Sequence, residues 1–272
     1  MTLFQTALLA AVLVGLLCGL VGCLVVLRRR AFFTVALTHA TFPGGVMAAV
    51  LGVNIVIGAG VMGVGLVALM VALSRIHRQG KQVASGIVLS FGYALGVFLH
   101  ALNPQLPVKV ESYLTGSILA IPPENIAIIG VVLLIALLAV ALWWKELLFS
   151  SFDRGGFVAN GYREWRTEVL VLLLITLTVV ATMPAIGSIL AISMIAAPAA
   201  AAGLLTKRIE RLVPLACALG VGSAVLGLYV SRWFNLAAGG AMAITATVIF
   251  LLAWGWNAAR ASIPARTKIA RG

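Results

Sequence analysis

A histidine lies inside an otherwise apolar run, in the stretch Thr38-His39-Ala40-Thr41-Phe42-Pro43-Gly44-Gly45. The run opens after the basic cluster Arg28 to Arg30, so His39 lies roughly nine residues in, or roughly 13 Å at about 1.5 Å per residue. That depth is near the middle of a hydrocarbon core about 30 Å thick. An imidazole there can bind a metal, relay a proton or hydrogen-bond a neighbouring helix. Because ionisable groups are costly at this depth, a functional role is our first hypothesis.

A second stretch, Ser193-Met194-Ile195-Ala196-Ala197-Pro198, repeats this arrangement: a hydroxyl, then a potential metal ligand, then a proline four residues after that ligand. Proline inside a membrane span removes a backbone hydrogen bond, and transporters tolerate this where broken helices line a path. The shared pattern is short, so chance in an alanine-rich chain explains it as well as an internal repeat does. The candidate metal ligands are His39 and, more weakly, Met194; the candidate path residues are Thr38, Thr41, Pro43, Ser193 and Pro198.

Composition places the chain in a membrane. Of its 272 residues, 62% are hydrophobic and 10% are charged, and the mean hydropathy is +1.15, which leaves too little polar surface for a soluble globule. The net charge of +12 comes from short basic clusters between apolar runs, without interleaved aromatics, so the clusters are topology signals and not a nucleic-acid site. The cysteines Cys18, Cys23 and Cys217 lie in apolar runs without CxxC spacing, which predicts small buried side chains.

The apolar runs predict an all-α, polytopic helix bundle that forms one transmembrane domain over residues 1–272. We expect nine spans, with eight or ten as alternatives; the least certain boundary is the one near Pro184 and Gly187, where two spans meet with almost no loop. The predicted spans are 3–27, 31–52, 55–74, 84–102, 124–144, 167–184, 186–206, 212–231 and 234–257.

The basic residues predict the orientation of these spans. If the spans alternate, every Lys and Arg except Lys109 and Arg232 falls on one side of the membrane. The positive-inside rule makes that side cytoplasmic, with the N-terminus outside and the C-terminus inside, as expected for a multi-pass protein of a bacterial plasma (inner) membrane.

Acidic residues are absent from the middle of the predicted spans: all seven lie in connections or at span ends. Ion-coupled carriers usually need an intramembrane carboxylate or an unwound polar site, so this distribution weighs against secondary transport. There is also no HExxH motif, and the GxxxxG spacing from Gly156 to Gly161 is followed by Tyr162 and Arg163 where a phosphate loop needs Lys and Ser or Thr. Energy for uphill transport must therefore come from another chain.

The longest internal connection, 145–166, predicts a short cytoplasmic amphipathic helix. Asp153 is a candidate N-cap, and Val158 with Tyr162, and Phe157 with Trp165, follow at helical spacing. We expect exposed aromatics that either meet a partner protein or lie on lipid headgroups, and both remain open. The longest external connection, 103–125, is where an outside partner or gate could act.

Two glycine pairs have GxxxG spacing, Gly15 with Gly19 and Gly92 with Gly96. Small faces of this kind let membrane helices approach closely. We favour packing within one subunit over a dimer seam.

Several stretches together resemble the membrane permease of ABC importers for zinc, manganese and related divalent metals. They occur in the family's order over most of the chain: Leu27-Arg28-Arg29 leading to Thr38-His39-Ala40 and Pro43-Gly44; Tyr113 to Leu119; Ser151-Phe152-Asp153 with Ala159 and Gly161; Ile186 to Leu190 through Pro198 to Ala201; and Ser231 with Gly239.

The resemblance implies a transport subunit that is not itself an enzyme and holds no permanent cofactor. ATP would bind a separate cytoplasmic ABC ATPase, docked on a coupling helix that includes Phe152, Asp153, Phe157, Ala159 and Gly161. Two permease copies would pair around a central path, and an extracytoplasmic metal-binding protein would deliver Zn²⁺ or Mn²⁺. No nucleic acid is implied; the remaining partner is the lipid bilayer.

The chain departs from the family at two positions. The family typically has an aspartate four residues before the histidine, and Val35 stands there; Ala237 stands near the usual late proline. Histidine without the hard carboxylate favours zinc over manganese. Permeation of an iron chelate or haem, and a stand-alone carrier or channel, are the alternatives.

Overall fold

The computed structural model describes residues 3–73, 81–104 and 116–261, which are almost entirely helical and, within those ranges, contain no strand. Nine helical segments there are long and apolar enough to cross a membrane, which confirms the predicted polytopic all-α bundle. The helices, in chain order, are α1 (Leu3–Leu27), α2 (Ala31–Ala40), α3 (Phe42–Val50), α4 (Ile55–Leu73), α5 (Lys81–Leu102), the 3-10 helix η1 (Ile118–Ala120), α7 (Pro123–Phe152), α8 (Arg154–Ala159), α9 (Glu164–Ile186), α10 (Ser188–Leu205), α11 (Ile209–Phe234) and α12 (Ala238–Ala261).

Two predicted spans differ most from the structure, and the ends of the other spans differ by up to four residues. The predicted span 31–52 is divided at Thr41 into α2 and α3, which together make one candidate span. The predicted span 124–144 ends at a kink, where Trp143 departs from helical geometry, and helical structure continues beyond the kink to Phe152 as part of α7. Charge at Lys145 and Glu146 ends the apolar run but does not end a helix, because both residues tolerate helical backbone well.

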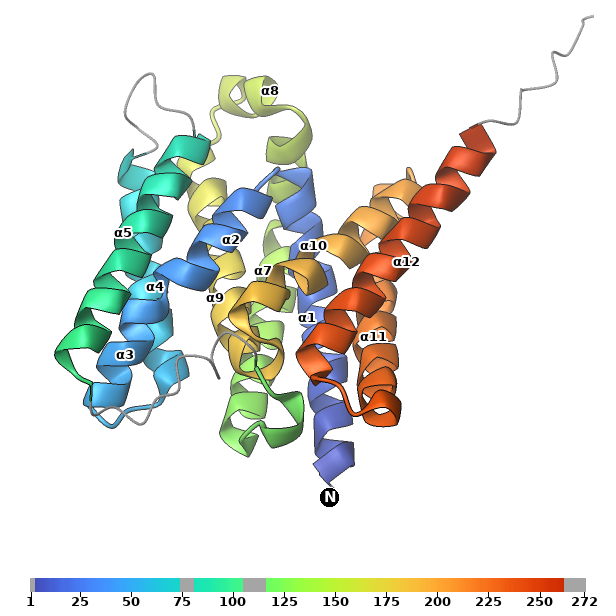
Figure 1. The fold of residues 1–272 in the computed structure, drawn as a ribbon. Coiled ribbons are helices and arrows are strands. Elements are labelled where there is room, and N and C mark those ends of the chain that lie inside the picture. Colours follow the sequence, from blue (N-terminus) through green and yellow to red (C-terminus); the bar gives the residue numbers. More distant parts are fainter. Residues whose placement is uncertain (1–2, 74–80, 105–115, 262–272) are drawn as a thin grey trace, which may run out of the picture.

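Helix α1 forms the centre of the bundle. It packs against α7, α9, α10 and α11, and α1 and α9 are buried along most of their length (Figure 1). Helices α2 to α5 form a second group at one side, joined to the centre through α9 and α10. As expected, Cys18 and Cys23 are buried, Cys217 is partly buried, and all are free thiols.

Glycine allows α1 to approach α11 at backbone distance. A Cβ placed on Gly19 would lie 2.5 Å from the carbonyl oxygen of Ala216, and one on Gly15 would lie 2.6 Å from the Cα of Val221. Similarly, Gly92 of α5 meets the backbone of Ala40 in α2. Both GxxxG pairs therefore carry contacts within one subunit, as predicted.

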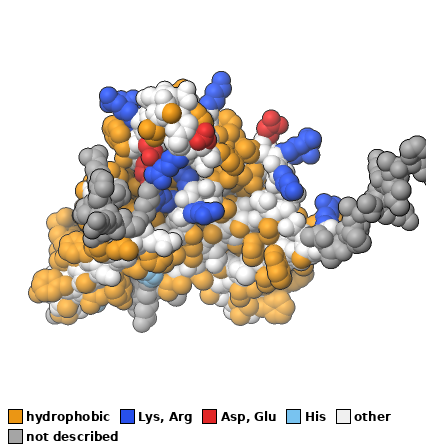
Figure 2. Space-filling model, turned by 90° about the horizontal axis from the view of Figure 1, so that it is seen from above, with side chains coloured by type: hydrophobic (Ala, Val, Ile, Leu, Met, Phe, Trp, Pro, Cys, Tyr) orange, Lys and Arg blue, Asp and Glu red, His pale blue; other side chains and the backbone are white. Residues whose placement is uncertain are grey.

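Charged side chains gather at the α8 end of the molecule: Figure 2, which looks down onto this end, shows Lys, Arg, Asp and Glu on the face and hydrophobic side chains along its lower edge and sides. This end holds α8, the turn between α1 and α2, and the start of α9 (Figure 1). An apolar body with charge at one end is the distribution that a bilayer imposes on a spanning protein.

The α1–α11 contact predicts a difference between two identical substitutions. Gly19→Ala should destabilise the detergent-solubilised protein by about 1–3 kcal/mol, because the new methyl group meets backbone that cannot move aside. Gly130→Ala on α7, where a Cβ meets nothing within 4 Å, should be neutral or slightly stabilising. Thermal unfolding of both variants checks this, and equal losses would refute the role of the close contact.

Candidate functional site

The stretch that carries His39 is a helix interrupted near its middle. Thr41 still donates its N–H to the carbonyl oxygen of Leu37 at 3.1 Å, but Pro43 follows at the start of α3. Since proline has no N–H, the carbonyl of His39 lacks the hydrogen bond that a regular helix would give it. The next residue, Gly44, meets α4 closely: a Cβ there would lie 2.3 Å from the carbonyl oxygen of Gly58.

His39 lies on a partly exposed face of α2. Phe32, Val35 and His39 follow one another at helical spacing and are exposed or half-buried, whereas the residues on either side of His39, Thr38 and Ala40, are buried. An ionisable ring on the rim of a membrane protein is costly if it meets lipid. The face that presents His39 therefore requires a covering surface or a water-filled space.

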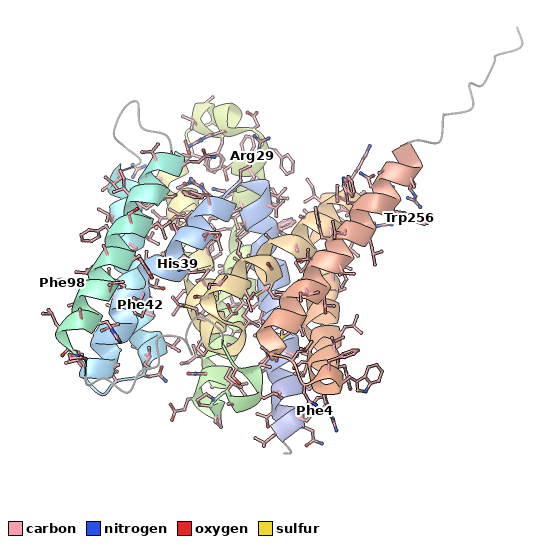
Figure 3. All side chains as sticks on the ribbon, viewed as in Figure 1. Phe4, Arg29, His39, Phe42, Phe98 and Trp256 are labelled. Carbon is pink, nitrogen blue, oxygen red and sulfur yellow. The ribbon has the colours of Figure 1, made fainter. Side chains whose placement is uncertain are left out.

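Tyr93 of α5 is the aromatic neighbour of His39. The two ring centroids are 6.1 Å apart with the planes at 85°, and the ring centroid of Phe42 lies 6.5 Å from that of Tyr93. Figure 3 shows His39 and Phe42 on the part of the chain that faces α5. Sequence reasoning missed Tyr93. The available signal was its position next to Gly92: a glycine that allows two helices to approach closely also brings the residue after it near the other helix.

The hydroxyls of the other candidates in this stretch bond to the backbone of their own helix. Thr38 Oγ1 donates to the carbonyl oxygen of Val35 at 2.7 Å, and Thr41 Oγ1 donates to that of Leu37 at 2.8 Å. Thr41 Oγ1 also lies 3.9 Å from the Sδ atom of Met183 in α9. Both threonines are buried, whereas His39 is half-buried, so His39 is the more exposed side chain of the three.

The second candidate stretch lies in α10, which packs against α2 (Figure 1). Within it Met194 is fully buried, Pro198 is buried and Ser193 is half-buried. The structure thus brings the two stretches onto neighbouring helices. Among the described residues, no group of three or more His, Cys, Asp and Glu side chains is placed to hold a metal ion. At this point of the bundle, one chain contributes a single imidazole and not a complete set of metal ligands.

The predicted cytoplasmic helix exists as α8. Asp153 is its N-cap, as predicted: its Oδ1 atom accepts a hydrogen bond from the N–H of Gly156 at 2.8 Å. The helix ends at Ala159, and Gly161, with φ of 81°, turns the chain toward α9. Helical spacing therefore does not continue to Tyr162 and beyond.

The expectation of an exposed Phe157 was wrong. Phe157 is 1% exposed, stacks on Tyr162 at a centroid distance of 4.8 Å, and meets Phe149 of α7 edge-on at 5.5 Å. A helix of six residues is not stable by itself, so it depends on tertiary contacts. Here Phe157 supplies them by packing against α7. The exposed apolar side chains of this segment are Phe152, Val158, Tyr162 and Trp165.

Beneath α8, a buried arginine, a second, partly buried arginine and a partly buried glutamate lie together. Arg28 and Arg30, in the turn between α1 and α2, both form ion pairs with Glu168 of α9. Burial lowers the pKa of each guanidinium to about 10, which still leaves both arginines charged at physiological pH. Sequence reasoning treated these arginines as topology signals, with Arg28 also part of the family resemblance, and had no means of finding their partner.

Comparison with known proteins gives consistent matches. The model of the ABC 3 transport family matches residues 1–256. The manganese transport system membrane protein MntC of Listeria monocytogenes is 34% identical over 250 residues, covering 92% of this chain and 89% of the relative. The chelated iron transport system membrane protein YfeC of Yersinia pestis is 30% identical over 248 residues, covering 91% and 84%. The structure of PsaBC from Streptococcus pneumoniae in complex with Fab has a TM-score of 0.83 at 31% identity, covering 93% and 91%.

The N-cap of α8 predicts the effect of removing its acceptor. Asp153→Ala should weaken α8 by about 1 kcal/mol and raise hydrogen exchange at the Gly156 and Phe157 amides about fivefold. Asp153→Asn retains the acceptor and should exchange like the original protein. Equal acceleration in both variants would show that the negative charge, and not the cap, stabilises the helix.

Proposed function

Since the chain belongs to the ABC 3 transport family, as the membrane permease of a metal importer, we propose that its cargo is a divalent transition-metal ion that passes His39. The observation that carries this proposal is the place of His39, within a membrane span, next to the break at Thr41 and Pro43, on a face that is only half-buried. A neutral imidazole is a common ligand for such ions.

We propose that a second copy of the chain covers the half-buried face of α2 that carries His39. Pairing would remove His39 from lipid and set two imidazoles across one central path. Two nitrogens replace only part of the hydration shell of an ion, so the ion would be held weakly. Weak ligation is what release on the far side requires. In this arrangement Thr38 and Thr41 hold the helix on either side of His39, Pro43 maintains the break, and Ser193, Met194 and Pro198 are candidate contacts from the neighbouring α10.

We propose zinc as the first candidate ion because of the ligands that this chain offers. Val35 supplies no carboxylate one turn before His39, and imidazole without a hard oxygen ligand suits Zn²⁺ better than Mn²⁺. Manganese is the second candidate because relatives such as MntC are named for its transport. A chelated iron cargo is supported by the likeness to YfeC.

Motive force is proposed to come from a cytoplasmic ABC ATPase docked on α8, with ATP bound to that partner and no catalytic residue or resident cofactor in this chain. Phe152 and Val158 are exposed there and suit a partner surface. Asp153, Phe157, Ala159 and Gly161 act by fixing the position and ends of the helix.

The proposed orientation follows from the charges. The α8 end, with its arginines, faces the cytoplasm of a bacterial cell and the N-terminus faces outward, where an extracytoplasmic metal-binding protein would deliver the ion. ATP binding at the partner would favour one of two openings of the bundle. It can shift that equilibrium only through a difference in affinity for the two states.

Removing the imidazole tests the metal path. In a strain that depends on this transporter, His39→Ala should lower zinc uptake more than about tenfold, because the path loses its nitrogen ligand. Val35→Ala, on the same half-buried face, is the matched control and should leave uptake near the original rate. Uptake from mixtures of Zn²⁺, Mn²⁺ and chelated iron ranks the cargoes; unchanged uptake of all of them by His39→Ala at normal expression removes His39 from the path.

Introducing a carboxylate tests the choice of ion. Val35→Asp places an oxygen ligand one helical turn from His39 and should raise the ratio of manganese to zinc uptake several-fold, because Mn²⁺ prefers hard oxygen ligands. Val35→Asn, of similar size but uncharged, should raise the ratio less. An unchanged ratio in Val35→Asp would show that position 35 does not face the ion.

A further inference from the structure

The buried charges beneath α8 join three elements at one carboxylate. Glu168, in the second turn of α9, lies 3.8 Å from Arg28 through its Oε2 atom, and its Oε1 atom pairs with Arg30. The exposed fractions of the side chains are 7% for Arg28, 6% for Arg30 and 15% for Glu168. Between the arginines, Arg29 adopts φ of 53°, which turns the chain sharply from α1 into α2. Both guanidiniums thereby point to the same acid.

Arg28 extends this cluster to the end of α7. Its Nε atom donates to Ser151 Oγ at 3.1 Å, and its Nη2 atom donates to Ser150 Oγ and to the carbonyl oxygen of Leu147 at 3.4 Å. Helix α7 then passes directly into α8 through the cap at Asp153. The arginine turn is therefore fixed to the helix that precedes α8.

The same cluster also holds the helix that follows α8. Glu168 belongs to α9, and the start of α9 is tied back to α8 by the ion pair between Arg154 and Glu164. Phe157 anchors α8 on Phe149 of α7. The segment α7–α8–α9 is thus joined as one hairpin, and the arginine turn is bonded to both of its arms.

Helix α2 connects this hairpin to the metal path. Arg30 is the N-cap of α2, its carbonyl oxygen accepts hydrogen bonds from the N–H and the Oγ1 of Thr34, and His39 follows in the same helix. Over the nine residues from Arg30 to His39, a helix spans roughly 13 Å as a stiff rod. A displacement of the hairpin that pulls on Arg30 must therefore move or tilt the helix that carries His39.

We propose that Glu168 is a positioning residue that transmits motion of α8 to the His39 helix, by holding Arg28 and Arg30 to the α7–α8–α9 hairpin. The inference rests on the proposed function, in which an ATPase moves α8. A carboxylate with two guanidiniums is a strong, directional joint in a buried site. Without it, α8 can still be moved by its partner, but α2 no longer follows.

The test compares ATP hydrolysis with metal uptake in liposomes that contain the complete transporter, with its ATPase. Glu168→Gln keeps the shape of the side chain and removes the charge. We expect assembly and hydrolysis close to the original values, with uptake per ATP reduced about tenfold, a size typical of coupling between distant sites. Glu168→Asp should recover part of the ratio. Glu210→Gln, an exposed acid in the first turn of α11, is the matched control and should leave the ratio unchanged.

A second variant and a direct measurement of motion complete the test. Arg30→Lys keeps the charge but loses the planar guanidinium that pairs with Glu168, and carries the same expectation if Glu168→Gln fails to assemble. Spin labels at the exposed positions Gly155 and Ala31, which lie outside the residues assigned to the partner surfaces, report α8 and α2. In the original protein, nucleotide should shift the distance of each label from its counterpart in the second copy. In Glu168→Gln the shift should persist for position 155 and vanish for position 31.

Three outcomes decide between the possibilities. An uptake-to-hydrolysis ratio in Glu168→Gln equal to that of the original protein overturns the proposal. Equal loss of hydrolysis and uptake in an assembled complex also overturns it, because the cluster would then be a structural clamp only. Absence of metal uptake by the original complex instead refutes the proposed function, and the two label distances still decide whether α2 follows α8.

Discussion

A hydrocarbon interior offers no hydrogen-bond partners, so polar side chains inside the bundle must find theirs within the protein. The threonines of the core do so locally. Thr34, Thr176 and Thr182 each donate to the carbonyl oxygen four residues earlier, at 3.1, 2.7 and 2.8 Å. Against this background His39 is unusual, because it is ionisable, partly exposed and in contact with the ring of Tyr93. These threonines satisfy their hydrogen bonds within their own helices. The imidazole of His39 is partly exposed and ionisable, which makes it a candidate for function.

In lipid, the hydrophobic effect does not drive helices together, so they associate through close packing. This explains the close backbone contacts of the bundle. Gly19 against Ala216 joins α1 to α11, Gly92 against Ala40 joins α5 to α2, and Gly44 meets α4. The last two contacts lie on either side of the break at Thr41. The stretch that carries His39 is thus held at backbone distance by α5 and α4, which fixes the ring relative to Tyr93.

Charged side chains are concentrated at the α8 end of an otherwise apolar body. Exposed apolar residues of the α8 segment lie at the surface, and the pairs of Glu168 with Arg28 and Arg30 lie beneath them. Buried ion pairs contribute little net stability because of the cost of desolvation. In our proposal their role is directional, because they connect the segment on which an ATPase would dock to the helix that carries the candidate metal ligand.

The sequence alone determined the features that depend on neighbours along the chain. Hydropathy predicted the nine candidate spans found among the described residues, and Asp153 marked the start of α8, because a cap is a contact over three residues. Tertiary structure decided what depends on distant segments: the burial of Phe157, the contact of His39 with Tyr93, and the pairing of Arg30 with Glu168. No periodicity records which helices become neighbours, since that is set by packing of the whole bundle.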